Sequence, residues 1–272
     1  MNYFFSIYLF FMEAIIELKK AYSKKHIFFL LATQDIKSRY SRSVLGVFWL
    51  TINICINISV LGFVFGYMLT DRFESFFPHL VIGILFWNLY ETFVTESATT
   101  YIDSSSLVLQ TNIPLLVYLF RVLLRAFIVF IHNVIIIPFL FIFFDLNITF
   151  TSFMLAVYAT ILMVIFCFSI GIFLSFISVR FRDFPSLFSN ITRTLFFFTP
   201  IIWMTDSIKS DFLISLVKLN PLYWFLKIFR DPLLYGSIEM NYFIASTAIS
   251  IILFILSMFF YGKYFKRLPY WL

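Results

Sequence analysis

The chain has 272 residues, of which 62% are apolar and only 12% charged, and its formal net charge is +6. In soluble domains about a quarter of the residues are charged, so this composition excludes a soluble protein and predicts an all-α integral membrane protein that crosses the bilayer several times. Cys55 and Cys167 both fall inside apolar runs, and we therefore expect free thiols without a disulfide.

Residues 1–43 form a charged N-terminal region, which we expect at the cytoplasmic surface. About ten apolar residues precede Glu13, too few to cross a bilayer. The charges at Glu13, Glu17, Lys19 and Lys20 suit an amphipathic helix lying in the interface. A frayed, partly disordered start is the alternative, and a cleaved secretory signal is disfavoured because a basic start and a small-residue cleavage site are missing.

The stretch QDIKSRYSRSVLG, residues 34–46, directly precedes the first long apolar run. On a helix Asp35, Arg39 and Arg42 share one face, and Asp35 stands in the favourable order for an ion pair with Arg39 four residues later. One interpretation is a simple positive flank of the membrane span. The other is an interfacial helix that presents these charges, together with Lys37, to a cytoplasmic partner.

Six apolar stretches are long enough to cross a bilayer as helices, since each has about 20 or more residues. They cover residues 44–69, 78–98, 118–144, 152–178, 186–205 and 242–262, and a cytoplasmic tail, residues 263–272, follows.

The basic residues between these stretches predict that both ends of the chain lie in the cytoplasm. With that orientation 15 Lys and Arg fall inside and five outside, in accord with the positive-inside rule. The inner set is Lys19, Lys20, Lys24, Lys25, Lys37, Arg39, Arg42, Arg121, Arg125, Arg180, Arg182, Arg193, Lys263, Lys266 and Arg267, and the outer set is Arg72, Lys209, Lys218, Lys227 and Arg230.

Polar and aromatic side chains in the first span point to a translocation path. Trp49, Asn53 and Asn57 follow one another at intervals of four residues and share a helix face. Asn is unfavourable in lipid, so this face should meet protein or a pathway. Phe48 and Trp49 could stack on a ligand in such a pathway; hydrogen bonding between helices is the equally good alternative.

Four charged residues lie within the second and third spans. Glu91 and Glu96 stand near the inner end of one, and Arg121 and Arg125 near the inner end of the next. An unpaired carboxylate in a membrane costs about 2.5–3.5 kcal/mol, so we expect Glu91 or Glu96 to pair with Arg121 or Arg125. A proton relay is the less favoured alternative because no deeper titratable group follows.

The fifth span ends in LFFFTPIIW, residues 195–203. Pro200 should kink or end the helix. Phe196, Phe197 and Phe198 point around most of its circumference, so some should face lipid and others could line a channel. The next segment, residues 204–236, is too polar to span and too apolar for a free loop, which favours short interfacial or re-entrant helices.

Three stretches resemble the permease subunits of ATP-binding-cassette exporters for cell-surface polysaccharides. The first is QDIKSRYSRSVLGVFWL at residues 34–50, which carries Asp35, Lys37, Arg39, Leu45, Gly46 and Trp49 of a family pattern. The others are SVRFRDFPSLFSNITRTLFFFTPIIW at 178–203 and LNPLYWFLKIFRDPLLYG at 219–236. The resemblance extends over nearly the whole chain from about residue 30.

The resemblance implies a homodimer driven by two copies of a separate nucleotide-binding subunit, which would hold the ATP and Mg. This chain has no GxxxxGK[ST] loop of its own, so we expect no cofactor, metal or catalytic residue in it. By the family pattern a coupling helix lies between the second and third spans. The residues expected to contact the ATPase are Asp35, Lys37, Arg39, Arg42, Ser104, Ser105, Leu107, Gln110, Arg180, Arg182 and Asp183.

The expected substrate is a lipid-linked polysaccharide of the O-antigen type, exported across the cytoplasmic membrane. Alternatives are a capsule or teichoic-acid exporter permease, or a permease that exports drugs or lipids. A membrane-bound transferase is disfavoured because His26, His79 and His132 are scattered along the chain and its acidic residues form no transferase-like cluster.

Overall fold

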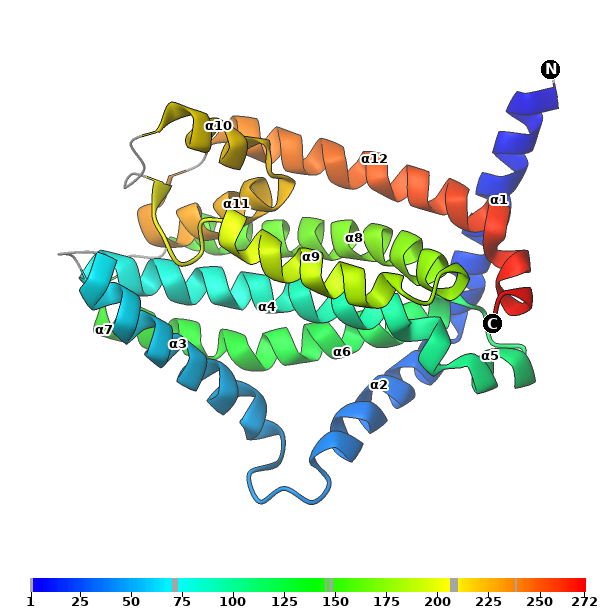
Figure 1. Cartoon of the computed structure of the whole chain (residues 1–272), viewed down its shortest axis with the longest axis horizontal. Helices are drawn as coiled ribbons and strands as arrows, with labels where there is room; N and C mark the ends of the chain where they lie inside the picture. Colours follow the sequence, from blue (N-terminus) through cyan, green and yellow to red (C-terminus); the bar gives the residue numbers. More distant parts are fainter. Residues whose placement is uncertain (1, 70–72, 145, 147–148, 206–209, 238) are drawn as a thin grey trace.

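The computed structural model describes residues 2–69, 73–144, 146, 149–205, 210–237 and 239–272, and most of them are helical. Arg72 and Lys209, two of the five outer basic residues in the orientation argument, lie outside these ranges. Within them no strand is present. The helices formed by residues 73–103, 116–134, 150–180 and 240–264 run roughly along the longest axis of the molecule, and both termini lie at the same end (Figure 1).

Among the described residues, five stretches are long and apolar enough to cross a membrane: Gly46–Gly66, Phe73–Asp103, Leu116–Phe143, Phe150–Arg180 and Met240–Tyr270. They contain helices α3 (Trp49–Leu69), α4 (Phe73–Asp103), α6 (Leu116–Val134) with α7 (Ile136–Phe143), α8 (Phe150–Arg180) and α12 (Met240–Tyr264). These helices overlap five of the six expected spans. The α4 helix extends beyond its expected span at both ends.

The remaining expected span, residues 186–205, contains the shorter helix α9 (Phe184–Phe198). Its 15 residues measure about 22 Å, less than the roughly 30 Å of a bilayer core. As expected for Pro200, the helix ends just before it, at Phe198. After it, α10 (Asp211–Leu219) and α11 (Pro221–Tyr235) meet at 89° and together form a broken span or a re-entrant loop, in line with the expectation for this segment.

The centre of the bundle is formed by α4 and α8, which are the most buried of the candidate spans. Phe93 of α4 packs over Gly171 of α8, where an added Cβ would come within 2.7 Å of the phenyl ring. By contrast α3 is the least buried span. It packs on α4 through Gly62 and Gly66, whose lack of side chains leaves room for the rings of Phe77 and Phe73.

Two helices precede the first span, α1 (Asn2–Ser23) and α2 (Lys25–Tyr40). The α1 helix packs on α12, where the Gly262 Cα lies so close to the backbone of Phe10 that a Cβ would come within 1.9 Å of its carbonyl oxygen. An ion pair of 2.5 Å joins Glu13 to Lys266 near the C-terminus. The N-terminal region is therefore a helix docked on the bundle instead of a frayed start.

An elbow joins α2 to α3 and projects from the bundle (Figure 1). It contains a short 3₁₀ helix, η1 (Gly46–Phe48), which starts at Gly46 with φ +54°. That left-handed conformation favours glycine. The α2 helix ends at Tyr40, so Arg42 lies in the elbow and does not continue the helical face of Asp35 and Arg39, contrary to expectation.

Candidate functional site

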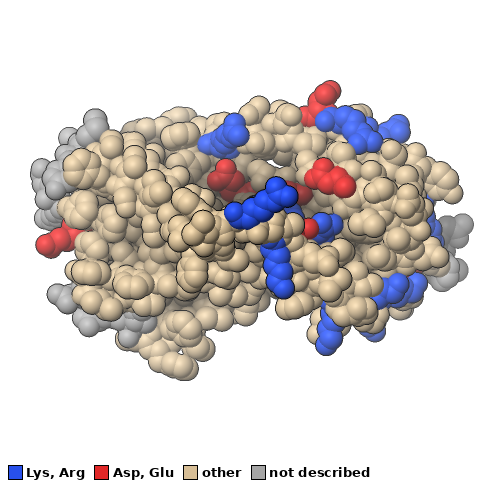
Figure 2. Space-filling view, turned by 90° about the horizontal axis from the view of Figure 1, so that it is seen from below, with Lys and Arg blue, Asp and Glu red and all other residues tan. Residues whose placement is uncertain are grey.

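A polar groove lies among α3, α4, α6 and α9. It has a volume of about 660 Å³ and is lined by Arg39, Leu50, Asn53, Ile54, Asn57, Leu61, Ile84, Trp87, Asn88, Glu91, Thr92, Val129, Asn133, Arg193, Phe196 and Phe197. Acidic and basic side chains gather near the middle of the face that carries the elbow (Figure 2). A groove with four Asn and three charged groups is unfavourable against lipid hydrocarbon.

Hydrogen bonds position several of the polar side chains in this groove. The Nδ2 of the buried Asn133 on α6 donates to Oδ1 of Asn88 on α4 at 3.3 Å. The indole Nε1 of Trp87 donates to Oε2 of Glu91 one turn further along α4, at 3.1 Å. Asn133 Oδ1 is buried without a protein partner among the described atoms. A groove built this way offers both hydrogen-bond donors and acceptors.

Four of the seven expected path residues line the groove, namely Asn53, Asn57, Phe196 and Phe197. Phe48, Trp49 and Phe198 do not. Phe48 belongs to the elbow and is 70% exposed, and Phe198 is also exposed at the end of α9. The stripe that begins at Trp49 therefore reaches the groove only from Asn53 onward.

Six further polar or charged residues line the groove that the sequence did not assign to the path: Arg39, Asn88, Glu91, Thr92, Asn133 and Arg193. Asn88 and Glu91 share one face of α4 at a spacing of three residues, which is a signal the sequence contains. Asn133 comes from α6, and only the packing of α4 against α6 shows that it reaches the same groove.

A cluster of ion pairs joins α2, α4 and α6 next to this groove. The Asp35 carboxylate accepts hydrogen bonds from Arg121 Nε at 2.7 Å and Nη2 at 2.5 Å, and from Arg125 Nη1 at 2.6 Å. Arg125 also pairs with Glu96 at 2.7 Å, and Arg39 lies 3.5 Å from Glu96. We refer to these five residues as the ion-pair cluster.

Glu96 with Arg125 is one of the four pairings that the sequence predicts. The expected pair between Asp35 and Arg39 is wrong, because the Asp35 carboxylate turns to the two arginines of α6. The other candidate, Glu91, is hydrogen-bonded by Trp87 and lies in the groove. The cluster therefore fixes the end of α2 to α6, a role for Asp35 that the local spacing did not indicate.

The segment between α4 and α6 contains a six-residue helix, α5 (Ser105–Gln110), at the same end as the termini (Figure 1). Leu107, Leu109 and Gln110 are exposed on it, whereas Ser104 is buried and Ser105 half-buried. A small hollow of about 80 Å³ lies between Ser104 and Arg121, Arg125 and Glu96. The base of α5 thus adjoins the ion-pair cluster.

The turn between α8 and α9 also lies toward this end, near the C-terminus (Figure 1). Arg182 Nη2 donates to the backbone oxygen of Leu272 at 3.3 Å, and the Arg180 guanidinium lies 5.7 Å from the centre of the Trp271 ring. Asp183 is exposed at the start of α9. Two of the three segments expected to meet a partner, α5 and residues 180–183, therefore lie toward one end, while Arg42 lies apart in the elbow.

A buried arginine holds α11 against the end of α9. Arg230 Nη1 donates to the carbonyl oxygen of Pro200 at 2.8 Å and lies 2.9 Å from Nε2 of His79 at the start of α4. Only 4% of Arg230 is exposed. The contact joins three segments far apart in the sequence and fixes the bent helix pair at the end of the molecule opposite α5.

Among the described residues no group of three or more His, Cys, Asp or Glu is placed to hold a metal ion. The candidate site consists of the polar groove, the ion-pair cluster and the small exposed helix α5.

Comparison with known proteins identifies a family and several relatives. Residues 26–234 match the family described as ABC-2 type transporter. The chain is 24% identical over 254 residues to an O-antigen export system permease protein, RfbA, of Klebsiella pneumoniae, covering 90% of this chain and 96% of the relative. A second Klebsiella pneumoniae protein of that name is 25% identical over 229 residues, covering 83% and 88%. One from Myxococcus xanthus is 22% identical over 207 residues, covering 75% and 78%.

Proposed function

Because this chain belongs to the ABC-2 type transporter family, we propose that it is the channel-forming permease subunit of an exporter that moves lipid-linked O-antigen-type polysaccharide. Transport runs outward across the cytoplasmic membrane. Two copies of the chain form the channel, and two copies of a separate ATPase subunit drive it. The substrate class follows the printed names of the relatives, which are O-antigen export permeases.

The observation that carries the proposal is the polar groove along membrane-spanning helices. A polar surface inside a membrane has to face water, protein or substrate. The groove is open on one side, and α3, which forms one of its walls, is the least buried span. A second copy laid over this face closes the groove into a channel and removes the polar groups from lipid.

The chemistry of the groove suits a sugar polymer. Sugar hydroxyls donate and accept hydrogen bonds, and the groove presents amides at Asn53, Asn57 and Asn88 to both roles. Phe196 and the exposed Phe197 add aromatic surfaces that pack on the apolar faces of sugar rings. Neutral amides and aromatic rings hold a polymer weakly at each repeat, so the chain can slide along the path.

The energy comes from a partner, because the chain contains no GxxxxGK[ST] loop to hold nucleotide phosphates. We place ATP and Mg on the ATPase subunit. Its docking surface on this chain is α5, with the exposed side chains Leu107, Leu109 and Gln110, and the neighbouring turn at Arg182 and Asp183. This assignment puts both termini in the cytoplasm.

The ion-pair cluster transmits the movement of the ATPase to the groove. Asp35 links α2 to α6, and Arg125 links α6 to Glu96 of α4. Arg39 belongs to the cluster and also lines the groove. Displacement of α5 or α2 by the ATPase therefore changes the relative positions of two helices that line the path, which is a hinge or shear transition of packed helices.

A groove-blocking variant tests the proposal in cells whose own copy of the gene is deleted. Asn57→Trp places an indole in the groove, and Ile252→Trp on the exposed face of α12 is the matched control. We expect Asn57→Trp to abolish O-antigen at the cell surface with normal chain abundance and normal ATPase association, and the control to restore it. Normal surface O-antigen in the deletion strain would overturn the assigned substrate.

A further inference from the structure

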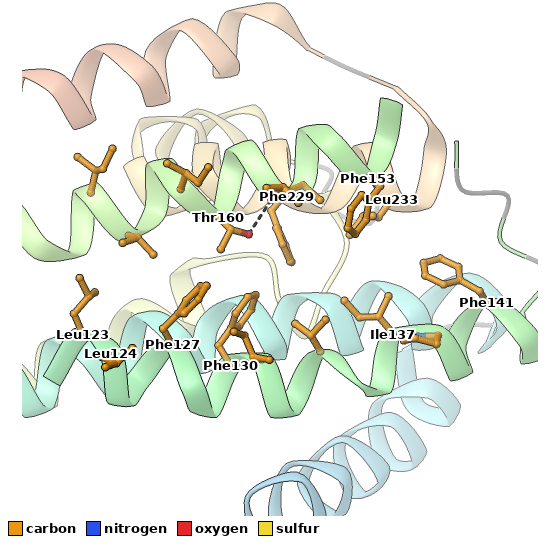
Figure 3. A pocket seen from close by; sticks show the side chains of 18 of the residues that line it. Leu123, Leu124, Phe127, Phe130, Ile137, Phe141, Phe153, Thr160, Phe229 and Leu233 are labelled. Atoms are coloured by element: carbon orange, nitrogen blue, oxygen red, sulfur yellow. Dashed lines mark hydrogen bonds between the residues drawn. The ribbon is translucent and has the colours of Figure 1, made fainter. Parts of the chain in front are cut away.

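A second, apolar groove of about 920 Å³ lies between α6 with α7 on one side and α8 on the other. Leu123, Phe127 and Ile137 point into it from one wall and Phe153 and Thr160 from the other, while Phe229 of α11 lies at its back (Figure 3). The groove extends from Phe120 near the inner end of α6 to Ile142 in α7, a rise of about 33 Å for 22 helical residues. It matches the thickness of the hydrocarbon core.

This groove faces away from the polar groove. Leu124, Phe127 and Ile131 of α6 line the apolar groove, whereas Val129 and Asn133 line the polar one. At 100° per residue these two sets lie on opposite sides of α6. The apolar groove is thus separate from the proposed path.

The groove has nothing to offer a polar ligand. The one hydroxyl in its lining, Thr160 Oγ1, donates to the carbonyl oxygen of Ala156 on its own helix at 2.8 Å. An empty groove of this size would forfeit the dispersion contacts of its lining. In a bilayer the molecules at hand to fill it are hydrocarbon chains.

Near the inner end of α6, beside Phe120, lies a second hollow of about 520 Å³, lined by Leu18, Lys19, Tyr22, Ser23 and Phe120. Phe120 lines both and packs against Phe28 of α2 with ring centres 5.3 Å apart. The corner between α1 and α2 that borders this hollow carries four lysines, Lys19, Lys20, Lys24 and Lys25.

The charge of this corner is only partly compensated. Lys20 pairs with Glu17 at 2.9 Å, and Lys24 donates to the carbonyl oxygen of Asn112 at 3.2 Å. Across the described residues no carboxylate lies within ion-pair distance of Lys19, Lys24 or Lys25. Basic pockets beside membrane helices on the cytoplasmic side attract anionic headgroups.

We propose that this combined site binds one anionic phospholipid of the inner leaflet, with an acyl chain in the groove between α6 and α8 and its phosphate at the corner of α1 and α2. The acyl chain fills the inner part of the groove around Phe28, Leu124 and Phe127. Lys19 and Lys25 contact the headgroup. Such a lipid joins α1, α2, α6 and α8.

Native mass spectrometry of the purified full chain tests the proposal without its ATPase, so the result does not depend on the exported substrate. The chain is titrated with phosphatidylglycerol and, separately, with phosphatidylcholine of the same acyl chains. We expect one phosphatidylglycerol to bind with clear preference. Lys19→Gln with Lys25→Gln should weaken it about fivefold for each lysine removed, the equivalent of about 1 kcal/mol per charge.

A second variant tests the acyl-chain part of the site. Ile161→Trp fills the groove from α8 and should abolish the bound phosphatidylglycerol, whereas Ile252→Trp on α12 leaves it in place. Thermal unfolding of each variant separates lost binding from lost folding. Any one of three results would overturn the assignment. The two phospholipids could bind equally well, phosphatidylglycerol binding could be unchanged in the lysine variant or in Ile161→Trp, or an equimolar polyprenyl phosphate could displace phosphatidylglycerol.

Discussion

The ion-pair cluster makes its sharpest prediction at Asp35. We expect Asp35→Asn to detach the end of α2 from α6, because the variant keeps the shape of the side chain but removes the only carboxylate that pairs with Arg121 among the described residues. The Lys37→Gln variant is the matched control, since Lys37 is exposed two residues further along the same helix.

The magnitude follows from the geometry. Asp35 accepts three hydrogen bonds from two arginines, and its side chain is 19% exposed. Removal of one partner from a buried ion pair costs about 3–5 kcal/mol. Arg125 keeps Glu96 at 2.7 Å and the cluster is partly solvated, so the lower end, about 3 kcal/mol, applies. Glu96→Gln should cost less, about 1–2 kcal/mol, because Arg125 then keeps Asp35.

Chemical unfolding of the purified variants in detergent measures the two losses, and hydrogen exchange of α2 amides reports its detachment. We expect Asp35→Asn to be more destabilising than Glu96→Gln, and Lys37→Gln to stay within about 0.5 kcal/mol of the parent. The double variant Asp35→Arg with Arg121→Asp should recover part of the free energy of unfolding that is lost when the pair between Asp35 and Arg121 is broken. The reasoning fails if Asp35→Asn behaves like Lys37→Gln, or if Glu96→Gln has the larger effect.

Three further substitutions probe other contacts. Gly262→Leu should push α1 off α12, because a Cβ there would overlap the Phe10 carbonyl; hydrogen exchange in α1 should rise, and unchanged protection would contradict the close contact. Arg230→Ala should cost about 3 kcal/mol in chemical unfolding, because it leaves a cavity and an unpaired Pro200 carbonyl. The substitution Lys218→Ala, at an exposed residue, should cost almost nothing. Equal losses in the two variants would refute the role of Arg230. Gly46→Val should cost at least about 1–2 kcal/mol at φ +54°, and Gly46→Asn should be better tolerated. Equal stability of the parent chain and both variants would count against the left-handed conformation at Gly46.

Much of the fold could be predicted from hydropathy alone. Apolar runs of about 20 residues mark membrane helices, and the helices lie where those runs do. The fifth run differs because hydropathy does not register a backbone break. Residues 199–203 are apolar enough to continue the span, but Pro200 ends α9 and the apolar side chains continue in a turn.

The candidate site was predictable where neighbouring residues on one helix determine it. Asn53 and Asn57 share a face by helical periodicity, and both line the polar groove. Asn133 joins Asn88 across 45 residues of sequence, and nothing in a single sequence specifies which faces of α4 and α6 meet. The periodicity argument also included Trp49, which the elbow leaves 37% exposed and outside the groove.

The partner of Asp35 shows why local rules are weak evidence for ion pairs. The four-residue spacing to Arg39 offers an exposed pair worth about 0.3–0.5 kcal/mol. Arg121 and Arg125 offer three hydrogen bonds in a half-buried place, and charge-assisted bonds there are worth several times more. The longer-range partners win, but their approach depends on the packing of α2 along α6.

Cysteine labelling tests most directly whether the groove beneath α3 is a water-filled path. Cys55 and Cys167 are first replaced, and single cysteines are then introduced at position 53, at position 57 and, as a lipid-facing control, at position 252. Membranes that contain the assembled transporter are treated with a water-soluble, membrane-impermeant maleimide. We expect the reagent to label positions 53 and 57, ATP turnover to change their labelling rate, and position 252 to stay unreactive. A water-filled path would be contradicted if cysteines at positions 53 and 57 were as unreactive as the cysteine at position 252, both with and without ATP.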